Sequence, residues 1–160
     1  MMRNIFLPLI AIILSATFQC CGTDKIQLPE SELQGKIEGA KWVYSSANAF
    51  RLSTDGQYQI RFLSTEEPVS NPCSLPRPGL THVKAIITPG LGNFAVSPQA
   101  LANNQVQVAF EAAPSRTLIA NSGFMEIFDF NGATMLGYLQ ASEDAENTFV
   151  SGRFTVEFCD

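Results

Sequence analysis

Histidine is almost absent from this chain of 160 residues, because His82 is the only one. A Ser-His-Asp or Cys-His catalytic group would therefore have to use His82, and the chain has no G-x-S-x-G motif to supply a serine nucleophile. We expect His82 to be a solvated or capping residue and the protein to have no catalytic residues. A hydrolase that uses His82 with a carboxylate is the enzymatic alternative.

Metal-binding patterns are also missing. Neither Cys73 nor Cys159 has a second cysteine at the C-x-x-C spacing of a zinc site. Several acidic side chains lie close together in residues 143–147, but they lack the glycine and the distant glutamate of an EF-hand. We therefore expect a solvated acidic turn there, and neither a bound metal nor a cofactor.

Basic clusters are missing as well. The ten Lys and Arg residues are scattered singly, and they face fifteen Asp and Glu, so the formal net charge is −5. Binding of nucleic acid needs a concentrated basic surface that neutralises phosphates. The composition therefore disfavours nucleic acid as a partner.

The first 22 residues form the most distinctive segment. Arg3 precedes an apolar run from Ile5 to Phe18, which is too short to cross a bilayer as a stable helix and is typical of an export signal. Cys20 and Cys21 follow this run directly. A plain cleaved signal and an uncleaved anchor with two idle thiols are the alternatives to a lipoprotein signal.

In this segment the chain resembles bacterial lipoproteins, in which a cysteine after the apolar run is acylated and becomes the first mature residue. The resemblance implies a signal peptide at residues 1–20 and acylation, including palmitate, at Cys21, with Cys20 as the alternative site. It also implies a lipid anchor in the bacterial cell envelope, at the outer membrane, so that the membrane is a partner. Residues 21–34 are polar and are expected to be a tether.

The remaining two cysteines, Cys73 and Cys159, form an even pair in a chain expected to reach an oxidising compartment. Such a pair predicts a disulfide, with two separate thiols as the alternative. In the chain-entropy model a bond that closes so long a loop stabilises the fold by about 4 to 5 kcal/mol. The bond would also hold the end of the last strand.

Hydrophobicity repeats with period two along residues 35–160, which is typical of half-buried strands. The clearest examples are residues 58–62, 106–110, 124–130 and 154–158, and further strands are expected near residues 35–42, 83–87, 94–96 and 137–141. The dipeptides Asp55-Gly56 and Asn131-Gly132 predict hairpin turns. We therefore expect one all-β domain, an antiparallel β-sandwich or barrel of about eight or nine strands.

One candidate contact for a ligand lies in the strand at 124–130. The alternation places Glu126 on the same side as Phe124 and Phe128. A carboxylate among phenylalanines needs a partner or a raised pKa, so these three side chains are the candidate binding residues. The alternative is that Glu126 is partly exposed at a sheet edge.

Two short motifs frame the domain. Gly39 and Trp42 begin it, with Trp42 expected in the core, and Gly152, Phe154, Val156 and Cys159 end it. In these motifs the chain resembles small lipid-anchored β-domains of unknown function in bacteria. The resemblance implies an envelope location and brings no activity.

These observations predict a non-catalytic binding or structural role in the envelope, with an unidentified protein or small molecule as partner. An alternative is a calycin-like carrier, in which the phenylalanines of the strands at 124–130 and 154–158 line a barrel that holds a small apolar ligand.

Overall fold

The computed structural model describes residues 30–52, 56–66, 71, 73–75, 79–99 and 104–159. The expected signal peptide and the acylation sites Cys20 and Cys21 lie outside these residues. Within the described part, no helix has the length and apolar character needed to cross a membrane.

Ten strands make up nearly all of the described regular structure. They are β1 (Gln34–Ile37), β2 (Ala40–Arg51), β3 (Tyr58–Ser64), β4 (His82–Ile87), β5 (Gly92–Val96), β6 (Gln105–Ala112), β7 (Arg116–Ile119), β8 (Ser122–Phe130), β9 (Thr134–Glu143) and β10 (Thr148–Cys159). One 3₁₀ turn, η1 (Asp144–Glu146), joins β9 to β10. The all-β class predicted from the alternation is confirmed.

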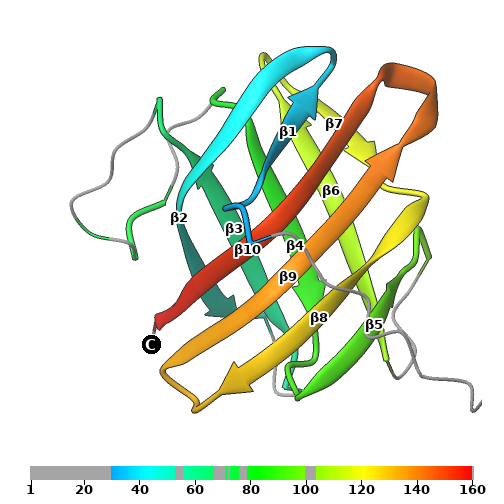
Figure 1. Cartoon of the computed structure of the whole chain (residues 1–160). Coiled ribbons are helices and arrows are strands. Elements are labelled where there is room, and N and C mark those ends of the chain that lie inside the picture. The colour runs from blue at the N-terminus through cyan, green and yellow to red at the C-terminus, as the bar shows by residue number, and fades with distance from the viewer. Residues whose placement is uncertain are drawn as a thin grey trace, which may run out of the picture.

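The sheet closes on itself into a nine-stranded barrel (Figure 1). The strand order is β4-β3-β2-β1-β10-β9-β8-β5-β6, and β6 pairs back with β4. β7 adds to the far end of β6. The pairings are antiparallel as expected, except that β5 runs parallel to β6 and β2 runs parallel to β10. Closure decides between the two predicted architectures in favour of a barrel.

The turn at Asn131-Gly132 joins β8 to β9 as predicted. The side chain of Asn131 accepts hydrogen bonds from the backbone N–H groups of Ala133 and Thr134, both at 2.9 Å. β2 and β3 form the other predicted hairpin, closed by the N–H of Leu52 donating to the carbonyl of Gln57 at 2.9 Å. Asp55 itself lies outside the described residues.

The segment expected as one strand at residues 35–42 is two strands. A tight turn at Glu38 and Gly39 divides it, with φ of 51° and 78° at these residues. Such a turn needs a positive φ at both positions, which glycine adopts freely and glutamate rarely does. β1 begins at Gln34, and Leu33 before it is fully buried, so the domain starts slightly before the expected boundary.

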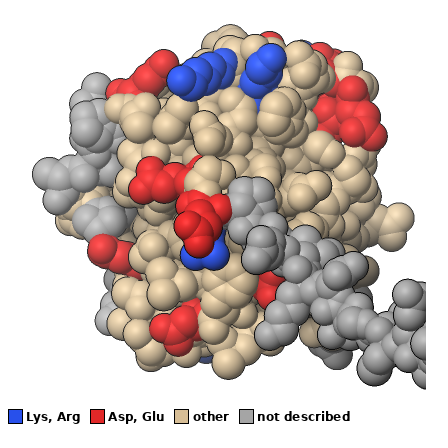
Figure 2. Space-filling model, in the orientation of Figure 1, with Lys and Arg blue, Asp and Glu red and all other residues tan. Residues whose placement is uncertain are grey.

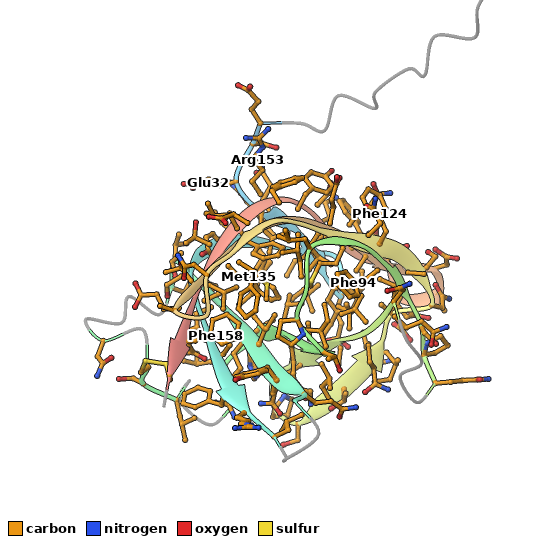
Figure 3. The ribbon with its side chains drawn as sticks, turned by 90° about the horizontal axis from the view of Figure 1, so that it is seen from below. Glu32, Phe94, Phe124, Met135, Arg153 and Phe158 are labelled. Carbon is orange, nitrogen blue, oxygen red and sulfur yellow. A yellow bond between two sulfur atoms is a disulfide. The ribbon has the colours of Figure 1, made fainter. Side chains whose placement is uncertain are left out.

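The barrel interior is filled with side chains. Phe62 and Phe154 meet edge to face at its centre, with ring centroids 5.1 Å apart, and Met125, Met135 and Leu139 are fully buried around them. Figure 3 looks along the barrel and shows Met135 and Phe94 inside the ring, whereas Phe124 lies outside it. Alternate residues of each strand supply this core, so its centre is packed and is not an empty channel.

Candidate functional site

One end of the barrel carries a hollow of about 450 Å³, which we call the mouth. Its lining residues come from the β1–β2 turn, the end of β3, the segment before β4 and the end of β6. The β1–β2 turn lies at the top of Figure 1. Its lining combines apolar and polar side chains, among them Ile37, Trp42, Ala112, Ser64, Thr65 and Thr81. A hollow of this size and composition is in the range of sites for small molecules.

Trp42 separates the mouth from the core. Its side chain is buried, as predicted, with 3% of its surface exposed, and it is the only tryptophan in the chain. Its indole Nε1 has no hydrogen-bond partner among the described residues. A buried donor without a partner costs about 1 to 3 kcal/mol.

A charged clamp holds the rim of the mouth. Arg116 donates from Nη1 to Oε1 of Glu38 at 2.6 Å and from Nη2 to Oε1 of Glu146 at 2.5 Å. Hydrogen bonding to Glu146 raises the pKa of Arg116. Glu38 lies in the β1–β2 turn, Glu146 lies in η1, and Arg116 is the first residue of β7. The arginine therefore links the start of β7 to both connections.

The acidic turn is thus engaged in local hydrogen bonds and one ion pair. The carboxylate of Glu143 accepts from the backbone N–H groups of Ala145 and Glu146, at 3.4 and 3.0 Å, and so caps η1. Among the described residues, no group of three or more His, Cys, Asp or Glu is arranged to hold a metal ion.

Where β1 does not lie between them, β2 and β10 are neighbours in the barrel wall, along a line that we call the seam. β1 pairs with β10 as far as Ser151, and the parallel ladder of β2 with β10 starts only at Asn48 and Glu157. In between, Tyr44 takes the place of backbone pairing: its hydroxyl donates to the carbonyl of Thr155 at 2.5 Å and accepts from the N–H of Thr155 at 3.3 Å. Burial raises the pKa of the Tyr44 phenol, which keeps it a donor.

The chain before β1 enters the barrel wall at the same seam. The N–H of Arg153 donates to the carbonyl of Ser31, and the N–H of Leu33 donates to the carbonyl of Arg153, both at 2.9 Å. Gly152 permits this approach, because a Cβ there would lie 2.5 Å from the backbone oxygen of Glu32. The close approach of this backbone therefore explains the glycine at position 152, in the motif that ends the domain.

A second hollow, of about 360 Å³, opens on the outside of the seam, and we call it the seam hollow. Its floor includes Tyr44 and Phe154, and its walls are formed by Phe128, Leu136, Arg153, Glu30 and Glu32. The guanidinium carbon of Arg153 lies 5.9 Å from the ring centroid of Phe128, a cation–π distance. Figure 3 shows Arg153 and Glu32 outside the ring.

The candidate residues on β8 do face one side, but it is the outer side. Phe124 stacks on Tyr138 with centroids 5.8 Å apart, and Glu126 is half-buried opposite Tyr138 in the ladder. Phe128 is 44% exposed at a bulge that follows Ile127. Of the three, Phe128 lines the seam hollow, the other two line neither of these two hollows, and none faces the barrel interior.

His82 lies at the start of β4 on the outer face of the barrel. Its Nδ1 is 3.0 Å from the carbonyl oxygen of Leu80, and its ladder neighbour is Glu111. Glu111 is engaged with Lys84 and with the hydroxyl of Thr117. Partial burial acts to raise the pKa of Glu111, but the hydrogen bonds from Lys84 and Thr117 outweigh it, so the pKa is lowered.

The predicted disulfide between Cys73 and Cys159 is present, with the two Cα atoms 5.6 Å apart. It fastens Cys73, in the connection between β3 and β4, to the last residue of β10, beside the parallel ladder of β2 with β10. The side-chain amide of Asn48, fully buried in that ladder, donates to the carbonyl of Ser74 at 3.1 Å. Cys73 and Ser74 thus lie against the lower part of the seam.

The surface is acidic overall. Figure 2 shows acidic side chains, in red, scattered over the face seen in Figure 1, with few basic ones, in blue, among them.

Comparison with known proteins gives no relative: no family model, no curated protein and no solved structure matches this chain.

Sequence reasoning missed both hollows. In the sequence, Arg153 is one of the scattered basic residues, and no local pattern distinguishes Tyr44. A mouth forms from the ends of strands distant in the chain, and periodicity reports only which face of one strand is buried. The glycine at 152 was the one local signal, since glycine inside a strand often marks a close backbone approach.

Proposed function

We propose that this protein is a non-catalytic binding protein of the bacterial cell envelope, anchored by lipid at Cys21 or Cys20 in the outer membrane, whose barrel mouth takes a small molecule. The observation that carries the binding role is the mouth itself: a hollow of about 450 Å³ lined by both apolar and polar side chains, beside which Arg116 binds Glu38 and Glu146. Barrel mouths are frequent sites for small ligands.

The packing of the core favours the mouth over the barrel centre as the ligand site. The centre is occupied by Phe62, Phe154 and their neighbours, so a small apolar ligand held deep in the barrel, as in a calycin-like carrier, would have to displace the core. At the mouth, a ligand meets Ile37 and Ala112 together with the hydroxyls of Ser64 and Thr81. These groups fit a compact molecule with both apolar and hydrogen-bonding parts.

The hydrolase alternative has less support. His82 lies on the outer face, and the mouth is lined by Thr81 before it. The nearest carboxylate in the ladder, that of Glu111, is already bound by a lysine and a threonine. A general base needs a free hydrogen-bonding position toward a substrate.

The single tryptophan makes the binding proposal testable. We expect protein purified from the envelope to carry a small molecule, identified by native mass spectrometry, and its titration to change Trp42 fluorescence. Ser64→Phe narrows the mouth and should abolish that change, whereas Ser122→Phe, on the outer face, should not. Equal binding by the two variants would place the ligand elsewhere and overturn the mouth as the site.

The anchor is tested separately. Metabolic labelling with a palmitate analogue should mark the protein, and the double change Cys20→Ala with Cys21→Ala should abolish labelling and membrane retention. Labelling that survives the double change, or a wild-type protein found wholly in the soluble fraction, would contradict the anchor.

A further inference from the structure

The seam hollow holds both signs of charge without pairing them. Among the described residues, the ion pairs join Lys84 to Glu111 and Arg116 to Glu38 and Glu146. None includes Arg153, Glu30 or Glu32, although all three line the hollow. The contact of Arg153 with the ring of Phe128 places its guanidinium against an aromatic wall, and a ring holds a cation without neutralising it.

Two large apolar side chains lie exposed beside these charges. Phe128 is 44% exposed and Leu136 is 41% exposed, and both line the same hollow of about 360 Å³. The hydroxyl of Tyr44 on the floor is engaged with the backbone of Thr155, so the floor adds no free polar group from this residue. The hollow therefore offers one cation, two carboxylates and an apolar wall.

We propose that the seam hollow binds the headgroup of a zwitterionic phospholipid of the phosphoethanolamine type, with the phosphate at Arg153, the ammonium at Glu30 and Glu32, and the first methylenes against Phe128 and Leu136. An arginine suits a phosphate, and the carboxylates suit an ammonium. A simple anion would be repelled by two glutamates, and a wholly apolar ligand would bury three charges without partners.

The choice of a lipid rests on the anchor in the proposed function. Cys21 and Glu30 are nine positions apart in the chain, and Glu30 is the residue of the hollow nearest the anchor. A chain of that length spans at most about 30 Å. A protein acylated at Cys21 would thus keep the hollow within reach of phospholipid headgroups at all times.

The test uses the full chain with Cys20→Ala and Cys21→Ala, so that binding does not depend on acylation. Dihexanoyl phosphatidylethanolamine, below the concentration at which it forms micelles, is titrated by calorimetry. We expect saturable binding that is at least tenfold weaker in Arg153→Gln. Lys36→Gln, which removes an exposed cation on β1 that lines neither hollow, is the matched control and should bind as the parent chain does. No binding, or equal binding by Arg153→Gln, would overturn the proposal.

A second comparison tests the zwitterion. The parent chain should prefer dihexanoyl phosphatidylethanolamine to dihexanoyl phosphatidylglycerol, and Glu30→Gln with Glu32→Gln should remove the preference. A preference for the glycerol lipid would contradict the assignment of the ammonium. Flotation with phosphatidylethanolamine vesicles then distinguishes the source: binding of the short lipid without flotation would show a site for free amphiphiles and overturn the role of the bilayer. Failure of palmitate labelling would contradict the anchor and leave the short-lipid result standing.

Discussion

The hydroxyl of Tyr44 on β2 donates to the carbonyl of Thr155 on β10 at 2.5 Å and accepts from the N–H of the same residue at 3.3 Å. One side chain thereby satisfies both backbone groups of a residue at the point where the barrel has no direct strand pairing. Behind this contact lie two core phenylalanines: the Tyr44 ring lies against Phe62, and Phe62 packs against Phe154.

Tyr44→Phe is therefore expected to destabilise the protein by about 1 to 3 kcal/mol, the cost of leaving buried polar groups without partners. Urea unfolding followed by circular dichroism measures the change. Tyr58→Phe is the matched control, because the Tyr58 ring packs edge to face on Phe158 and that contact is retained. A Tyr44→Phe protein as stable as the control would show that the hydroxyl does not support the seam.

Loss of the disulfide should also destabilise the seam, because Cys159 lies in the ladder of β10 with β2. Cys73→Ser with Cys159→Ser releases a closed loop whose ends are 86 residues apart, and the chain-entropy model predicts a loss of about 4 to 5 kcal/mol. The melting temperature of the wild-type protein should fall on reduction, while that of the double variant should not respond to reductant. Alkylation of both cysteines in unreduced, denatured protein from the envelope would disprove the bond.

Glu111 is expected to make stability depend on pH. Its pKa is lowered in the folded protein, so its contribution is present above the ordinary carboxyl pKa and is lost as the pH falls through the lowered folded value. Glu111→Gln should cost about 0.5 to 1 kcal/mol at pH 7, in the range of a partly exposed ion pair. The cost, measured by urea unfolding, should shrink as the pH falls below about 4. A cost independent of pH would mean that packing, and not charge, explains it.

His82 is expected to be chemically idle. Its ring lies on the outer face near the carbonyl of Leu80, so His82→Ala should change the free energy of unfolding by about 0.5 kcal/mol or less. The variant should also restore the wild-type phenotype in a strain that lacks the protein. Loss of phenotype at unchanged stability would favour the enzyme hypothesis. Lys84→Ala should be tested beside it, because Lys84 lies on the same face of β4 and supports Glu111.

The sequence by itself determined the strands, because the alternation of apolar and polar residues at 58–62 or 154–158 is a local property that burial of one face requires. It also determined the turn at Asn131-Gly132, which is a local property too, because Gly132 adopts a φ of 88° without strain. The chain has four cysteines, and if Cys20 and Cys21 belong to the expected anchor, Cys73 and Cys159 are the two that remain to form a disulfide.

Only the tertiary structure decided closure, the mouth and the seam hollow. Whether β2 meets β10 depends on long-range pairing, and a sandwich and a barrel share the same alternation of inward and outward residues. The side of β8 that faces outward was likewise undetermined, so Phe124 and Glu126 could be grouped but not placed. Arg153 and Glu32 are 121 positions apart, and they line one hollow because the chain before β1 enters the wall at Gly152. Such sites arise from how strand ends meet in space, a relationship that no local pattern records.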